Sequence, residues 1–221
     1  PIQNFVSDVT KEGPPLSVTA APYIRARLRE GWWGIADTFL NRGTLDYERG
    51  GTDFTGKGLK EVLSPVKNNL QDFSTYLIAK AVPARESLGK TTGITTETAK
   101  GTVESLEKKY PHFRVIANDV RTFQQGVLDY YRKSGLLSQE TMALFNKLYT
   151  NYVPFYREFP RETAGQSLGK GLANLPQAIK RARGSEATIV DPLESIIKNI
   201  YTFIDLAERN RVTRALTDLA D

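Results

Sequence analysis

The stretch DPLESIIKNIYTFIDLAERNRVTRALTDLAD, residues 191–221, decides the fold of this chain. Asp191, Pro192 and Glu194 stand where a capping box places its N-cap, first-turn and third residues, so they mark the start of a helix. Apolar residues then recur at steps of three and four, which is typical of one face of an amphipathic helix. Such a stripe needs another apolar surface to cover it. Its members are Leu193, Ile196, Ile197, Ile200, Ile204, Ala207, Leu216 and Leu219.

Five earlier segments show the same helical spacing of apolar residues. Ser64 and Pro65 interrupt the second segment, so either a new helix starts there or one helix kinks, and Pro83 is expected to end it. No alternation of apolar and polar residues is long enough to predict a strand. The sequence therefore predicts an all-α fold, an elongated multi-helix bundle with a long C-terminal amphipathic helix and an irregular N-terminal segment. The earlier helices are expected over residues 22–40, 58–82, 96–109, 112–134 and 138–149.

The predicted organisation has four parts. Residues 1–56 form an N-terminal arm with one helix and a glycine-rich connector, and residues 57–156 form a helical bundle whose short connections favour antiparallel neighbours. Residues 157–190 form a basic, glycine-containing loop, and residues 191–221 form the long C-terminal helix. The chain begins with Pro1, which fits either removal of an initiator methionine or an excerpt from a longer polypeptide.

Residue counts exclude several kinds of chemistry. The chain has no cysteine, which excludes disulfides, thiol nucleophiles and thiolate metal sites. His112 is the only histidine, and its neighbours are typical of a turn between helices, so it is expected to be structural. No apolar run reaches the roughly 20 residues of a membrane-spanning helix, and the first residues do not resemble a signal peptide. We therefore expect a soluble, unsecreted chain.

Two motifs that resemble catalytic or binding sites lack the necessary context. ARESLGKT, residues 84–91, satisfies a relaxed nucleotide-binding P-loop pattern, but it follows a helix instead of a strand, and Gly89 is expected to cap that helix. Two pairs of carboxylates lie beside lysines or arginines on helices, which is typical of a solvated face. These pairs are Glu104 with Glu107 and Asp205 with Glu208. The sequence predicts no catalytic residue, metal ligand or cofactor, and this segment is not expected to be an enzyme.

Basic residues exceed acidic ones in a stretch rich in glycine, and the net charge of the whole chain is +5. One interpretation is a solvated linker, and the other is a nucleic-acid-binding segment with Trp32, Trp33 or Tyr152 available for stacking on bases. Its candidate phosphate contacts are Arg157, Arg161, Lys170, Lys180, Arg181 and Arg183.

Protein interaction is the other candidate function of the apolar residues. Trp32 and Trp33 are adjacent, so they point about 100° apart on a helix, and one is expected in the core while the other meets a second element or a partner. On the last helix, the apolar stripe is expected to contact other copies or other proteins. The candidate interaction residues are Trp32, Trp33, Ile196, Ile200 and Ile204.

Three stretches of the chain resemble a known family. They are DFSTYLIAKAVPARESLGKTTGI (72–94), SGLLSQETMALFNKLYTNYVPFYREF (134–159) and DPLESIIKNIYTFIDLAERNRVTRALTDLA (191–220). In order and spacing they resemble the large polyvalent proteins of tailed bacteriophages, over roughly residues 57–221. The resemblance implies an ordered piece of a very long virion protein whose enzymatic modules lie elsewhere, and it supplies no catalytic residue for these positions.

The resemblance implies a function and a location. The chain is expected to be a non-catalytic structural and interaction segment of an internal, ejection-type virion protein. It would lie inside the capsid or near the tail, assemble with itself or with other virion proteins, and be delivered into the host cell with the DNA. Two alternatives stay open: a nucleic-acid-binding module that uses residues 157–183, and part of an entry enzyme that degrades the cell wall.

Overall fold

The structure is a computed structural model. It is mostly helical and contains one two-stranded sheet within the residues that it describes. The predicted all-α class is therefore confirmed. The described residues are 26–27, 29–46, 53–90, 92–148, 153–154 and 190–218.

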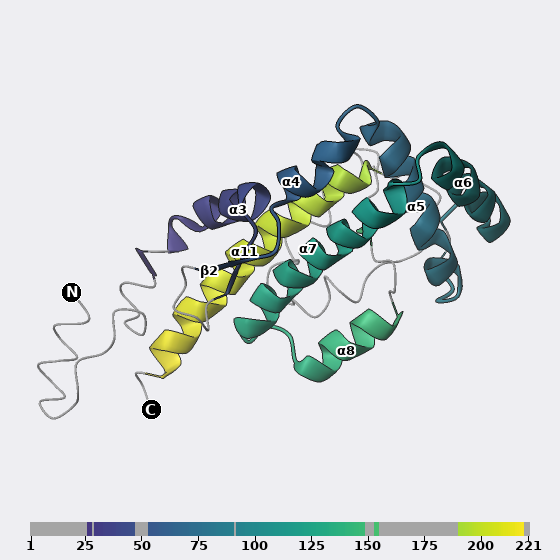
Figure 1. Ribbon diagram of the computed structural model, residues 1–221. Coiled ribbons are helices and arrows are strands. Elements are labelled where there is room, and N and C mark those ends of the chain that lie inside the picture. Colours follow the sequence, from purple (N-terminus) through teal and green to yellow (C-terminus); the bar gives the residue numbers. More distant parts are fainter. Residues whose placement is uncertain are drawn as a thin grey trace, which may run out of the picture.

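The described elements form an elongated body, with α6 at one end and the end of α11 at the other (Figure 1). In chain order they are α3 (Trp32–Asn41), β1 (Thr44–Asp46), β2 (Asp53–Thr55), α4 (Leu59–Leu63), the 3₁₀ turn η2 (Ser64–Val66), α5 (Leu70–Glu86), α6 (Thr96–Lys109), α7 (Phe113–Lys133), α8 (Gln139–Leu148) and α11 (Pro192–Thr217).

Local signals place several helix ends where the sequence predicts them. Helix α6 spans the predicted residues 96–109, and the Thr95 side chain accepts the Thr98 backbone N–H at 3.2 Å at its start. At the start of α11, one carboxylate oxygen of Asp191 accepts the Leu193 N–H at 2.7 Å and the Glu194 N–H at 3.4 Å. The long C-terminal helix and its N-cap are therefore confirmed.

Helices α5 and α6 form an antiparallel pair at one end of the body. The Tyr76 hydroxyl donates to a Glu107 carboxylate oxygen at 2.5 Å. Near the same end, the Lys109 ammonium lies 3.1 Å from an Asp72 carboxylate oxygen. Because both contacts join the first part of α5 to the last part of α6, the two helices run in opposite directions, as their short connection predicts.

The two longest helices, α7 and α11, run side by side in the same direction (Figure 1). The Asn210 amide of α11 donates to the Ser134 carbonyl at 2.8 Å, just beyond the end of α7. The Arg214 guanidinium donates to the same carbonyl at 3.5 Å. Carbonyls at a helix end have no partner within the helix, so α11 supplies side-chain donors that the end of α7 needs.

Most of the buried apolar residues belong to one hydrophobic core. It joins α3, α4, α5, α7 and α11. Aromatic edge contacts link distant parts of the chain: the ring centroids of Phe39 and Tyr130 lie 5.1 Å apart, and those of Phe73 and Phe113 also lie 5.1 Å apart. The first and last described helices thus belong to the same packed unit.

The predicted glycine-rich connector contains a β-hairpin that the sequence does not predict. Strand β1 pairs antiparallel with β2, with Thr44 opposite Thr55 and Leu45 opposite Phe54. Strands of three residues are too short to show alternation. The hairpin lies against α7 at Gly126, where a Cβ atom would come within 2.5 Å of the Thr44 hydroxyl.

Three helix predictions differ from the structure. The helix predicted over residues 22–40 is interrupted by a turn at residues 30–31, and α3 begins at Trp32. The interruption at Ser64 and Pro65 is a 3₁₀ turn, and a new helix, α5, begins only at Leu70. Helix α5 then continues through Pro83 to Glu86, so the prediction that Pro83 ends the helix is wrong. Proline inside a helix costs about 3 kcal/mol. Val82 packs on Ala99, and Arg85 donates to the Val153 carbonyl at 2.9 Å, which offsets that cost.

Candidate functional site

The three isoleucines predicted as an interaction surface lie in the core of the same chain. Ile196, Ile200 and Ile204 are fully buried. Helices α3, α5 and α7 cover the side of α11 on which they lie. These three side chains therefore form no surface for a partner, because the rest of the chain has already removed them from water.

The two tryptophans separate as predicted. The Trp32 ring packs edge-on against Tyr201 of α11, with centroids 6.0 Å apart, and joins the edge of the core. Trp33 is 63% exposed. Of the two, only Trp33 is left as a surface group on α3.

The basic stretch predicted as a phosphate-binding segment lies outside the described residues. This applies to each of its candidates and to Tyr152. The prediction for this stretch therefore stays a prediction. The candidates concerned are Arg157, Arg161, Lys170, Lys180, Arg181 and Arg183.

The motif that resembles a P-loop is a helix end. The backbone N–H of Gly89 donates to the Glu86 carbonyl at 2.9 Å, and that of Lys90 donates to the Arg85 carbonyl at 2.9 Å. Gly89 has a φ of +67°. This pair of bonds is the Schellman motif that closes many helices, so residues 84–90 have the structure of a cap. The interpretation of Gly89 as a cap is confirmed.

The carboxylate pair on α11 is not the solvated pair that the sequence predicts. Glu208 is only 3% exposed, and it accepts the Tyr130 hydroxyl at 2.5 Å. The Arg211 Nε lies 3.2 Å from the same carboxylate oxygen, and the guanidinium covers the Tyr130 ring at 4.8 Å. Asp205 pairs with Arg209 at 2.9 Å nearer the surface. The buried cluster of Tyr130, Glu208 and Arg211 joins α7 to α11. The spacing of residues on α11 alone does not predict it.

Helix α8 leaves two leucines in solvent. Met142 is buried, and the Gln125 amide of α7 donates to Asn146 at 2.7 Å. On the other side, Leu144 is 55% exposed and Leu148 is 38% exposed. Residues four apart on a helix share a face, so these leucines form one exposed apolar pair.

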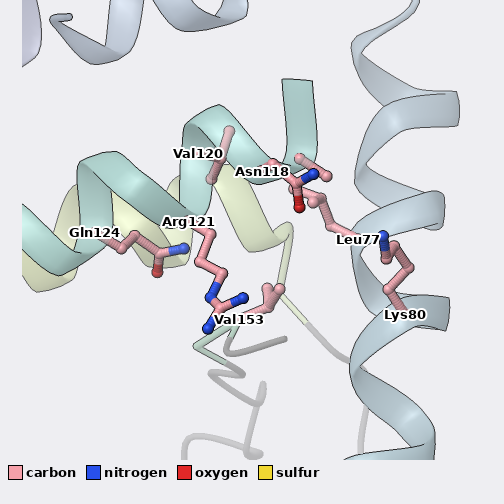
Figure 2. A pocket seen from close by; sticks show the side chains of 8 residues that line it. Leu77, Lys80, Asn118, Val120, Arg121, Gln124 and Val153 are labelled. Carbon is pink, nitrogen blue, oxygen red and sulfur yellow. The ribbon is translucent and has the colours of Figure 1, made fainter. Parts of the chain in front are cut away.

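A shallow recess lies between α5 and α7 (Figure 2). Its interior offers about 20 Å³ to the centres of water molecules, which is room for about one water. A space of this size cannot enclose an organic substrate. Four polar side chains stand around an apolar floor; the lining residues are Lys80, Asn118, Arg121, Gln124, Leu77, Ala117, Val120 and Val153.

Positive charge gathers beside this recess. Burial lowers the pKa of Lys80, Glu107 opposes that shift, and Arg114 adds to it. The Lys80 ammonium lies 5.2 Å from the centre of the Tyr76 ring. Burial and the hydrogen bond to Glu107 raise the pKa of Tyr76, so its hydroxyl stays protonated and keeps donating to that carboxylate.

The structure also shows where His112 lies and whether the described residues provide metal ligands or membrane-spanning helices. His112 is exposed at the start of α7, next to the rings of Tyr110 and Phe113. Among the described residues, no three histidine or acidic side chains lie together in a way that could hold a metal ion. None of the described helices combines the length and the apolar character needed to cross a bilayer.

Comparisons with the profiles of known protein families, with curated proteins and with solved structures give no match.

Proposed function

We propose that this chain is a non-catalytic helical module that assembles with copies of itself or with other proteins, as part of a large internal virion protein of a tailed phage. The exposed leucine pair of α8, Leu144 and Leu148, is the observation that carries the assembly. The phage context comes from the sequence resemblance of residues 72–94, 134–159 and 191–220. In that context the module lies in the virion and takes part in DNA delivery.

The energetics of α8 support an interface. Full burial of one leucine side chain contributes about 1.5–3 kcal/mol. Leu144 and Leu148 are 55% and 38% exposed, so together they leave about one leucine side chain to bury. Their burial on a partner would therefore contribute about 1.5–3 kcal/mol for each copy, before the cost of association. Trp33 is a separate exposed apolar group, on α3 and apart from α8 (Figure 1). Large aromatic side chains are enriched among the residues that dominate binding energy.

The assembly is tested by replacing both α8 leucines with serine. We expect the unmodified chain to increase in mass with concentration in light scattering, or to retain other virion proteins on a column. L144S/L148S should lose this association and keep its helical circular dichroism. The matched control is Val115→Ser, because Val115 is 59% exposed on α7. A chain that stays strictly monomeric and retains no virion protein would contradict the proposal.

A further inference from the structure

The cations beside the α5–α7 recess lie together without an ion-pair partner among the described carboxylates. Elsewhere on the surface, Lys57 lies 3.9 Å from Asp119, and Lys198 lies 2.7 Å from Glu194. In contrast, Lys80, Arg114 and Arg121 form no ion pair with a described carboxylate. Glu107 is the acidic group that acts on Lys80, and its carboxylate already accepts the Tyr76 hydroxyl.

The three cations come from two helices that tertiary packing brings together. Lys80 extends from α5, and Arg121 extends from α7 on the other side of the recess (Figure 2). Arg114 lies seven residues before Arg121, which is two turns, or about 10 Å, along the same face of α7. Asn118 stands between the two arginines and offers an amide donor. The result is a row of donors along a helix axis.

The form of the recess restricts what these cations can bind. Its interior holds about one water, so neither a base nor a sugar can enter it. A charged oxygen at its mouth can still reach the side chains around it. A row of cations with spacing of about 10 Å suits a linear polyanion better than a single small anion, because each cation then meets a different charge.

We propose that the row formed by Lys80, Arg114, Asn118 and Arg121 binds the phosphate backbone of a nucleic acid. Each guanidinium can donate two parallel hydrogen bonds to one phosphate group. The Asn118 amide can donate to an adjacent phosphate oxygen, while Lys80 adds a point charge from α5. These contacts carry no base recognition, so binding is independent of sequence. The inference does not depend on the assembly proposed above.

The test measures fluorescence anisotropy of a labelled oligonucleotide, single-stranded and duplex, against the full chain over a series of salt concentrations. We expect affinity to fall steeply as salt rises. The double variant K80Q/R121Q should bind about tenfold or more weakly, and its salt slope should fall by about two, because two phosphate contacts are lost. The matched control, K100Q/K108Q, removes the same charge from exposed positions on α6 and should change affinity less than about twofold.

Four results would overturn the proposal. The first is absent or salt-independent binding, and the second is an equal loss in both double variants, which indicates a net-charge effect. The third is full binding by K80Q/R121Q together with its loss in a variant of Lys180, Arg181 and Arg183, which places the site in the basic stretch. The fourth is competition by inorganic phosphate as strong as by the oligonucleotide, which indicates a small-anion site. Circular dichroism of each variant shows whether the fold is kept.

Discussion

Helices α11 and α8 begin alike and end in different surroundings. Each has a side-chain cap, Asp191 for α11 and Ser138 for α8, and each carries apolar residues at helical spacing. Three other helices cover the apolar side of α11. Helix α8 contacts α7 through the Gln125–Asn146 hydrogen bond and leaves two leucines exposed. The comparison shows that an apolar stripe predicts the need for cover without indicating whether the same chain provides it.

The largest expected effect comes from the buried charge that α11 carries and α8 does not. Glu208→Ala should lower the free energy of unfolding by about 3–5 kcal/mol, because Arg211 and the Tyr130 hydroxyl lose a buried acceptor. Urea unfolding measures the change. Glu194→Ala removes a surface pair with Lys198 from the same helix and should cost less than about 1 kcal/mol. Equal losses in the two variants would contradict the assignment of Glu208 to the core.

Apolar truncation compares the two helices directly. Ile200→Ala on α11 should cost about 2–5 kcal/mol, because the side chain is fully buried. Leu144→Ala on α8 should change stability by less than about 0.5 kcal/mol, since its side chain is largely in water. Both variants are measured by the same denaturant titration. The contrast between the helices would be lost if Leu144→Ala proved as costly as Ile200→Ala.

The stability of the contact between α7 and α11 is expected to depend on alkaline pH. Tyr131 of α7 packs against Phe203 of α11, with ring centroids 5.0 Å apart, and burial raises the pKa of Tyr131 to about 12. An unfolded tyrosine titrates near pH 10. Between about pH 10 and 12 the unfolded chain therefore binds fewer protons, and this residue lowers the unfolding free energy by up to about 1.4 kcal/mol per pH unit.

Tyr131→Phe should make the loss of stability above pH 10 less steep and leave the dependence near pH 7 unchanged. Thermal melts over a pH series measure this. Unchanged steepness above pH 10 would show that the Tyr131 phenol ionises as readily in the folded chain as in the unfolded one.

The smallest expected effect concerns the two caps. Asp191→Ala should cost about 0.5–2 kcal/mol, because the carboxylate accepts two backbone N–H groups and the Ser74 hydroxyl at 2.8 Å. Ser138→Ala removes the cap of α8 and should mainly increase local fraying. Amide hydrogen exchange separates the two outcomes: faster exchange across the core for the first, and within α8 alone for the second. Faster exchange across the core in Ser138→Ala would show that α8 is as tightly coupled as α11.

Local signals made much of the helical fold predictable. Thr95 and Pro111 bracket α6, and Asp191 starts α11, because caps and prolines act within one turn of their own position. Pro83 was misleading, since contacts of Val82 and Arg85 with distant parts of the chain override its effect on the helix. The hairpin was missed because its strands are only three residues long.

The sites depend on contacts between residues far apart in sequence. Glu208 was expected in solvent because its neighbours on α11 are charged, yet Tyr130 of α7 covers it. Lys80 and Arg121 come from different helices, and neither segment alone indicates that they flank one recess. Ile200 illustrates the same limit, since its spacing predicts burial and the covering surface comes from other helices.

The packing of α11 into the core determines when this core can be completed during synthesis, because α11 follows every other described helix in the chain. Ile204 and the donors Asn210 and Arg214 emerge from the ribosome after every other described helix has been made. Until then, Phe39 and Tyr130 lack the helix that completes their core. A nascent chain that stalls before residue 190 therefore exposes these aromatic side chains. Chaperones bind exposed hydrophobic surface of this kind.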